Sequence, residues 1–207
     1  MKYIYLIRHS SPFVEIENYI NRENILWDEY NTNMLLSVEG EHKALELCNI
    51  KELHKINNVY SSNSPRAIQT AKYISEMNNT KIKLDTRINE RYFGIEHLYE
   101  LPEDYTSKSF NNKNFKINNG ESLNELDIRF KDFLQEILNN NTKTIIVIHG
   151  IILSSFLQNY CEFKYENDYM TATYNNKKVI EAKPKSPGVY KITYNDNNEL
   201  IDIDVIN

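Results

Sequence analysis

The sequence feature that most constrains the fold is a pair of short apolar segments, YIYLI at residues 3–7 and TIIVI at residues 144–148. Neither segment alternates apolar with polar residues, which is typical of a strand buried on both faces in a parallel sheet. Each segment stops abruptly, the first at RHSSP and the second at HG. Open α/β sheets usually bind their ligands at the carboxyl ends of such strands. We therefore expect an α/β fold whose functional site lies where these two segments end.

Helical segments follow the expected strands. Ser64 is a favourable N-cap, and Pro65 suits the first helical position because its missing N–H costs nothing there. An Asn/Asp turn between two alternating runs predicts an antiparallel hairpin near the end of the chain. The other expected elements are a helix from Ser37 to about Leu53, strands at 59–61 and 81–85, a helix over 121–140 and a helix after Gly150.

The length of 207 residues suits one domain, so we expect residues 1–207 to form a single domain with an excursion over the sheet at about 95–119. Residues 13–36 and 162–187 are further polar connections, the second of them rich in lysine. Because binding residues are often carried on loops, we expect these three connections to decide which substrate is accepted.

Composition excludes several classes of partner. A net charge of -5 argues against non-specific binding to nucleic acid, which requires a basic face. The apolar runs are too short for a signal peptide or a membrane span, so we expect no membrane contact. Cys48 and Cys161 show no C-x-x-C spacing, which indicates neither a zinc site nor a disulfide framework. We expect a cytoplasmic protein, and its oligomeric state stays open.

Three expected junctions between a strand and the next helix carry groups suited to phosphate: Arg8 and His9, then Arg66, then His149. In a parallel sheet these junctions lie on one edge, so the groups can converge, and helix N-termini there favour an anion. Each residue alone is more typical of a surface ion pair or a core histidine. Together they supply a nucleophile and donors for phosphoryl transfer, with His9 attacking as the neutral imidazole.

A leaving alkoxide needs a proton, and Glu90 in the segment INERYFG is the best-placed donor because it follows a strand. To act at neutral pH its pKa must be raised, by burial against Tyr92 or Phe93 or by the charge of the phosphate. The same carboxylate could then activate water. We also expect four residues to contact the substrate, namely Ser10, Ser11, Arg91 and Gly150.

With these residues assembled, the chain resembles the histidine phosphatase superfamily, also called the phosphoglycerate mutase-like family. Matching segments occur in the family's order: YLIRHSSP, LSVEGEHKAL, SSNSPRAIQTA, INERYFG, GESLNEL and VIHGIIL. Three features depart from the family pattern: Ser10 replaces its usual Gly, Ser11-Pro12 follows in place of a more usual pair, and Phe93 stands where a mutase has a Tyr.

The resemblance implies a three-layer α/β/α sandwich around a mostly parallel sheet, and chemistry that needs no metal or other cofactor. It implies that His9 is the phosphorylated nucleophile and Glu90 the proton donor. The phosphoryl group would be held by Arg8, Arg66 and His149.

The function we expect is that of a phosphoric monoester hydrolase of the histidine acid phosphatase type, acting on a small phosphorylated metabolite. A cofactor-dependent phosphoglycerate mutase would also fit, in which Arg87, Arg91, Lys108 or Lys113 would hold a second anionic group. The sequence leaves two more functions open, hydrolysis of phosphohistidine on a protein partner and non-catalytic binding of a phosphorylated ligand.

Overall fold

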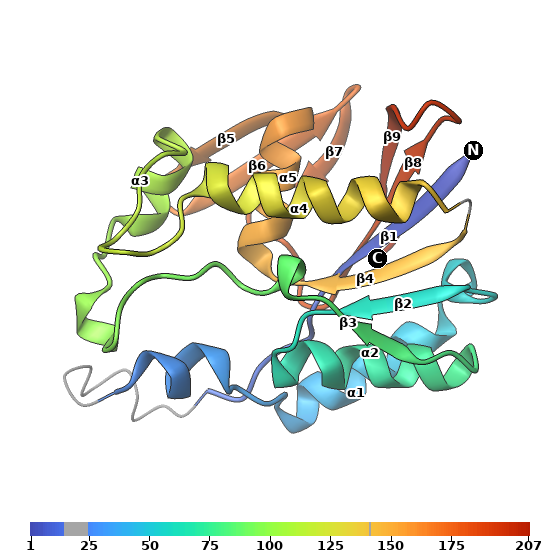
Figure 1. The fold of residues 1–207 in the computed structure, drawn as a ribbon, viewed down its shortest axis with the longest axis horizontal. Coiled ribbons are helices and arrows are strands. Elements are labelled where there is room, and N and C mark those ends of the chain that lie inside the picture. Colours follow the sequence, from blue (N-terminus) through green and yellow to red (C-terminus); the bar gives the residue numbers. More distant parts are fainter. Residues whose placement is uncertain (15–24, 141) are drawn as a thin grey trace.

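The computed structural model describes residues 1–14, 25–140 and 142–207. Its centre is a six-stranded sheet with the strand order β3-β2-β4-β1-β8-β9 (Figure 1). The strands of this sheet are β1 (Lys2–Arg8), β2 (Asn58–Ser61), β3 (Ile82–Leu84), β4 (Thr144–Ile148), β8 (Gly188–Tyr194) and β9 (Leu200–Val205).

Most of the sheet is parallel, as expected. Strands β1, β4, β2 and β3 run in one direction, whereas β8 runs antiparallel to β1 and pairs with β9 in the predicted hairpin. Arg8 is in register with Ile148, so β1 and β4 end side by side. The residues that follow these two strands therefore begin at the same point of the sheet edge.

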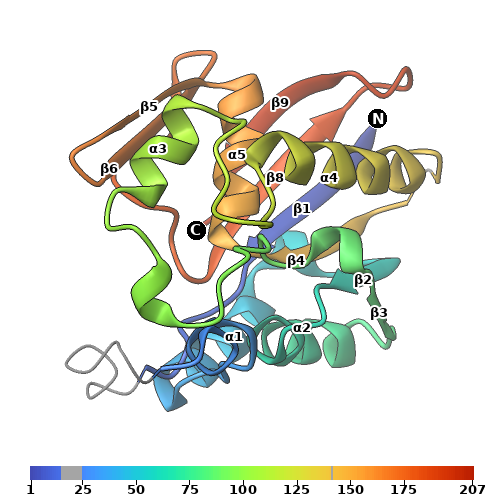
Figure 2. The ribbon, with the colours of Figure 1, turned by 60° about the vertical axis from the view of Figure 1, so that its left-hand side comes forward.

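Helices cover both faces of the sheet (Figures 1 and 2). Alternate residues of β1 supply two separate cores: Ile4 and Leu6 pack with α4 and α5, whereas Tyr5 and Ile7 pack with α2. This two-sided burial explains why the first apolar segment does not alternate, and it confirms the three-layer sandwich. The helices are α1 (Val38–Glu46), α2 (Pro65–Met77), α4 (Leu123–Leu138) and α5 (Gly150–Tyr160).

Residues 162–187 differ from the polar connection that we expected, because most of them form a second, antiparallel sheet. Its strands are β5 (Glu162–Glu166), β6 (Tyr169–Tyr174) and β7 (Lys177–Ile180). The turns between them place pairs of Asn or Asp residues at positive φ, as tight hairpins require. The excursion at 95–119 contains α3 (Tyr105–Asn111), which lies against β5 (Figure 2).

The helix expected from Ser37 to Leu53 is shorter than predicted. It ends at Glu46, and two 3₁₀ turns at Leu47–Asn49 and Lys51–Leu53 continue the chain. Further single turns are a π-helical turn at Asp28–Thr32 and 3₁₀ turns at Thr86–Ile88 and Leu98–Glu100. Residues 15–24 of the first polar connection lie outside the described residues. In the described ranges, no helix combines the length and the apolar character that crossing a membrane requires.

Candidate active site

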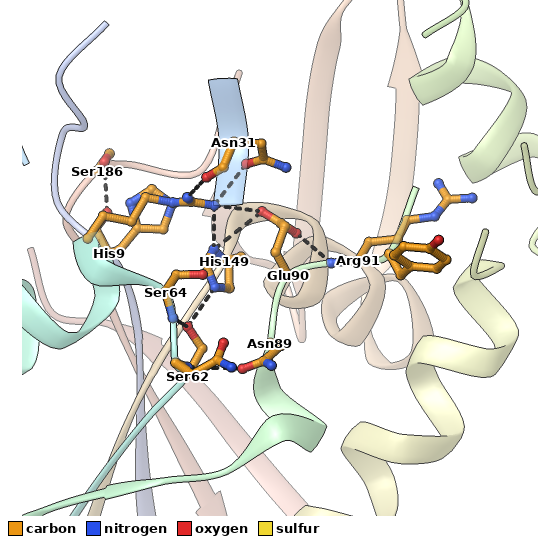
Figure 3. Close-up of polar contacts among 12 residues, drawn as sticks. His9, Asn31, Ser62, Ser64, Asn89, Glu90, Arg91, His149 and Ser186 are labelled. Carbon is orange, nitrogen blue, oxygen red and sulfur yellow. Dashed lines mark hydrogen bonds and ion pairs between the residues drawn. The ribbon is translucent and has the colours of Figure 1, made fainter. Parts of the chain in front are cut away.

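The structure brings His9, Arg66, Glu90 and His149 together at the carboxyl edge of the central sheet (Figure 3). His9 follows β1, His149 lies between β4 and α5, and Arg66 occupies the first turn of α2. The rings of His9 and His149 meet edge to face with their centroids 5.2 Å apart. Separate strand ends therefore deliver His9, Arg66 and His149 to one point, as expected of a parallel sheet. Glu90 instead lies in the irregular segment after the 3₁₀ turn Thr86–Ile88.

The hydrogen bonds of His9 define its tautomer. Its Nδ1 lies 2.8 Å from the carbonyl oxygen of Ser10, which can only accept, so Nδ1 carries the proton. Nε2 lies 3.1 Å from the Nε of Arg66, which can only donate, so Nε2 presents a lone pair. Burial, followed by the charge of Arg66, lowers the pKa of His9 to about 3. His9 is thus a neutral imidazole at physiological pH.

His149 is also held neutral. Arg66 Nη2 donates to its Nδ1 at 3.1 Å, which leaves the proton on Nε2, 2.8 Å from the hydroxyl of Ser62. Burial and the charge of Arg66 keep the pKa of His149 well below its usual range. Sequence reasoning did not single out Ser62, although it lies in the segment SSNSPRAIQTA and directly follows β2.

Glu90 faces both Arg66 and His149. Its Oε2 lies 3.6 Å from Arg66 Nη2 and 3.3 Å from His149 Nδ1, while Oε1 accepts the backbone N–H of Arg91 at 3.0 Å. Burial raises the pKa of Glu90, although the charge of Arg66 opposes this effect. The carboxyl group can therefore keep a proton to higher pH than an exposed glutamate.

Of the two aromatic residues expected to bury Glu90, Tyr92 is 64% exposed. Phe93 is buried instead and lines one cavity with Glu90. Adjacent residues of this irregular segment point in different directions, and the sequence could not show which of the two faces the carboxylate.

Arg8 lines the same cavity as His9 and Arg66. Its Nη1 donates to the carbonyl oxygen of Pro184, whereas its buried Nε has no hydrogen-bond partner among the described residues. Gly150 makes room for this guanidinium, since a Cβ at that position would lie 3.1 Å from Arg8 Nε. Gly150 thus lines the cavity and also leaves Arg8 the space that it needs.

The turn after His9 is fixed by internal hydrogen bonds. Ser10 donates its hydroxyl to the carbonyl oxygen of Gly40 at 2.7 Å and its backbone N–H to Thr70 Oγ1 at 2.9 Å. The Ser11 hydroxyl donates to the carbonyl oxygen of Ser186 at 3.3 Å. The hydroxyls of Ser10 and Ser11 thus bind α1 and the segment before β8, and neither residue lines the cavity, so their expected contact with the substrate stays a prediction.

Gly40 allows α1 to approach this turn closely, which leads to a prediction about stability. A Cβ at Gly40 would lie 2.0 Å from the carbonyl oxygen of Ser11, so Gly40→Ala must push α1 away from the turn. We expect this variant to lose about 1–3 kcal/mol of unfolding free energy in urea denaturation, as for other overpacked sites. Val38→Ala is the matched control, because Val38 starts the same helix and is 77% exposed. Equal unfolding free energies for Gly40→Ala and wild type would contradict the prediction.

Arg91 is not brought to the His9 cluster, although we expected it to contact the substrate. Its guanidinium donates to the carbonyl oxygens of Glu121 and Phe115 and to the hydroxyl of Ser109. Its side chain points away from His9 and His149 (Figure 3). Arg91 thus ties the irregular segment after Glu90 to the excursion over the sheet.

The other cations that we considered for a second anionic group form ion pairs within the fold. Arg87 binds Asp85, Asp132 and Glu136, Lys108 binds Asp104, and Lys113 binds Asp127.

Asn31 is a residue that sequence reasoning missed. It lies in the π-helical turn Asp28–Thr32, and its carbonyl oxygen and its Oδ1 both accept from the guanidinium of Arg66. Gln69 fixes the end of the same connection by accepting the backbone N–H of Leu36 at 2.8 Å. Nothing in the local pattern around Asn31 indicated these contacts.

A cavity of about 580 Å³ opens beside the cluster, lined by His9, Arg8, Arg66 and Glu90 together with aromatic and aliphatic side chains. This volume is typical of small-molecule sites. The guanidinium groups can hold an anion there, Nε2 of His9 can attack it, and Glu90 can give or take a proton. Within the part of the chain that the structure describes, no three His, Cys, Asp or Glu side chains are placed to hold a metal ion.

Comparison with known proteins gives a family match over nearly the whole chain. The family model of the histidine phosphatase superfamily (branch 1) matches residues 4–197. The chain is 25% identical over 158 residues to a Hydrogenobacter thermophilus protein named as a phosphoserine phosphatase, covering 72% of this chain and 74% of that protein. It is also 25% identical over 162 residues to an Enterobacter sp. protein named as a phosphoglycerate mutase, covering 74% and 72%.

Solved structures agree with this fold. A mycobacterial glucosyl-3-phosphoglycerate phosphatase, solved with VO3, superposes with a TM-score of 0.70 at 14% identity. The match covers 99% of this chain and 97% of that one. At this identity the likeness concerns the fold alone.

Proposed function

Because the chain belongs to the histidine phosphatase superfamily (branch 1), we propose that it hydrolyses a phosphomonoester of a small metabolite through a phosphohistidine on His9. The observation that carries this proposal is the tautomer of His9. Its proton is on Nδ1 and its Nε2 lone pair lies beside the guanidinium of Arg66, where a phosphoryl group would bind. Relatives named as a phosphatase and as a mutase support phosphoryl transfer as the reaction class.

In the first step, His9 Nε2 attacks phosphorus and the bond from phosphorus to the ester oxygen breaks. Arg8 and Arg66 donate to the phosphoryl oxygens, where the negative charge is spread. His149 joins them once its Nδ1 takes up a proton from solvent, which the charge of the bound phosphoryl group favours, and this proton returns to solvent when phosphate leaves. Glu90 gives its proton to the leaving oxygen, and the alcohol departs.

In the second step, water attacks the phosphohistidine while Glu90 accepts a proton from that water. The bond from phosphorus to nitrogen breaks, and inorganic phosphate leaves with His9 again neutral. A general acid in one half-reaction thus serves as the general base in the other.

Mutase activity is the second candidate, because one relative is named as a phosphoglycerate mutase. A mutase must retain its first product and keep water away from the phosphoenzyme. Arg87, Lys108 and Lys113 are paired within the fold, and Arg91 donates to groups of the fold. None of these four cations is therefore placed to hold a glycerate carboxylate in the way that the sequence-based mutase hypothesis required.

One incubation separates these activities. We expect the pure protein to release free phosphate from members of a panel of phosphorylated metabolites. With 3-phosphoglycerate and catalytic bisphosphoglycerate, we expect no 2-phosphoglycerate. EDTA should leave the rate unchanged, because His9, the two arginines, His149, Glu90 and water supply every group that the proposed steps use. Formation of 2-phosphoglycerate would establish the mutase instead, and no turnover of any ester would favour a non-catalytic binding module.

A further inference from the structure

Much of the cavity wall beside His9 consists of packed aromatic rings. Trp27, Phe93 and Tyr105 follow one another with ring centroids 4.7 Å and 5.5 Å apart, and Phe110 pairs with Tyr165 at 5.3 Å. All five line the cavity. Rings that pack on one another hold their positions, and these rings give this part of the cavity an apolar, aromatic lining. The wall therefore suits an alcohol that carries an apolar, aromatic portion.

Three cations line this cavity in the described part of the chain, namely Arg8, Arg66 and Lys183. The two arginines lie beside His9, where the phosphoryl group is expected. Lys183 is exposed, and its side chain makes no hydrogen bond or ion pair with any described residue. Asp168, also on the cavity wall, instead accepts the hydroxyl of Tyr165 at 2.7 Å. Lys183 is thus a positive charge on the cavity that the fold itself does not use.

The backbone on either side of Lys183 is anchored. The carbonyl oxygen of Ala182 accepts the N–H of Met170 at 2.8 Å, and the carbonyl oxygen of Pro184 accepts from Arg8. Lys183 therefore directly precedes Pro184, whose carbonyl oxygen contacts Arg8 of the proposed phosphate site. Its flexible four-carbon stem can place the ammonium beside a substrate bound at that site.

We propose that Lys183 binds a second anionic group on the alcohol half of the substrate. The preferred substrates are then phosphomonoesters of alcohols with an aromatic ring. These alcohols also carry a carboxylate or a similar anion. This inference rests on the proposed phosphatase function and adds the substrate class. Lys183 thus takes the role of binding a second anionic group. We considered four other cations for this role from the sequence, and all four make contacts within the fold.

The test compares 4-carboxyphenyl phosphate with phenyl phosphate, which lacks the second charge. The quantity measured is the ratio of kcat/KM for the carboxylated ester to kcat/KM for the plain ester. We expect Lys183→Met to lower this ratio about threefold to fivefold, the upper range for an exposed ion pair. Charge reversal in Lys183→Glu should lower it about tenfold, since attraction becomes repulsion. Salt should reduce the wild-type ratio through screening.

Lys185→Glu is the matched control. Lys185 is also exposed and lies two residues further on, but it lines a different cavity. The Lys185→Glu substitution changes the net charge by the same amount as Lys183→Glu. We expect it to leave the ratio of the two kcat/KM values unchanged. Circular dichroism of all variants checks the fold.

The outcomes distinguish this inference from the function on which it rests. If both esters are hydrolysed but Lys183→Glu keeps the wild-type ratio, or shifts it no more than Lys185→Glu, Lys183 does not select the substrate and the phosphatase proposal stands. If the wild-type protein releases phosphate from neither ester nor from the metabolite panel, the proposed function itself fails.

Discussion

His9→Ala is expected to hydrolyse para-nitrophenyl phosphate on the order of 10⁴-fold more slowly than wild type, or not measurably. The reason is that the proposed reaction needs a nucleophile, and removing one typically costs at least this factor. His149 cannot replace it, since His149 is fully buried and, unlike His9, does not line the cavity. The measurement is the rate of para-nitrophenolate release at saturating substrate.

Three further measurements distinguish loss of the nucleophile from loss of the fold. His42→Ala is the matched control, because His42 is exposed on α1, and we expect it to retain wild-type activity. Thermal unfolding and circular dichroism compare the folds of the variants. A labelled phosphoenzyme that forms in wild type and is absent from His9→Ala would identify the attacking residue directly. Undiminished turnover in His9→Ala would exclude His9 as the nucleophile.

The broad arrangement of the site follows from the sequence for a physical reason. Segments without alternation predict a parallel sheet buried on both faces, and parallel strands end on one edge. Any side chains at those ends must therefore approach each other, and His9, Arg66 and His149 do so. The antiparallel hairpin of β8 and β9 was likewise predictable from its alternation and its turn residues.

Other parts of the site depended on directions that no local pattern encodes. Ser10 looked like a substrate ligand, but its partners are Gly40 and Thr70, 30 and 60 residues away in the chain. Arg91 adjoins Glu90, yet it turns toward residues 109–121. Asn31 reaches Arg66 only because tertiary contacts place its connection over α2. Sequence spacing specifies which residues end a strand, whereas packing decides which way each side chain then points.

The second sheet was missed although the sequence carried its signal. Segment EFKYE alternates, and the structure buries Phe163 and Tyr165 more than their neighbours. Two asparagine-rich turns separate the three strands. The lysines of this region suggested a polar loop, but Lys164 occupies an exposed position of β5 between Phe163 and Tyr165. This sheet supplies the cavity with Tyr165 and Met170, so it contributes to the site as well as to the fold.

Glu90→Gln should damage the hydrolysis of esters with poor leaving groups far more than that of para-nitrophenyl phosphate. An alkoxide needs a proton in order to leave, whereas para-nitrophenolate does not, so we expect kcat/KM to fall about 10²–10⁴-fold for an alkyl phosphate and much less for the aryl ester. For each ester, kcat/KM reports only the steps up to release of the alcohol. The amide has nearly the same size and can still accept the N–H of Arg91. Glu96→Gln is the matched control, because Glu96 is exposed six residues further on.

The pH dependence of kcat/KM for the alkyl phosphate also tests whether Glu90 is the proton donor. Burial raises the pKa of Glu90, so the protonated, donating form persists to higher pH than for an exposed glutamate and is lost as pH rises through that raised pKa. Wild-type kcat/KM should fall along this limb, and Glu90→Gln should lack the limb because glutamine does not titrate. The low pKa of His9, about 3, keeps the nucleophile neutral over the whole interval. Equal losses on both esters, or a limb that survives in Glu90→Gln, would assign the proton to another group.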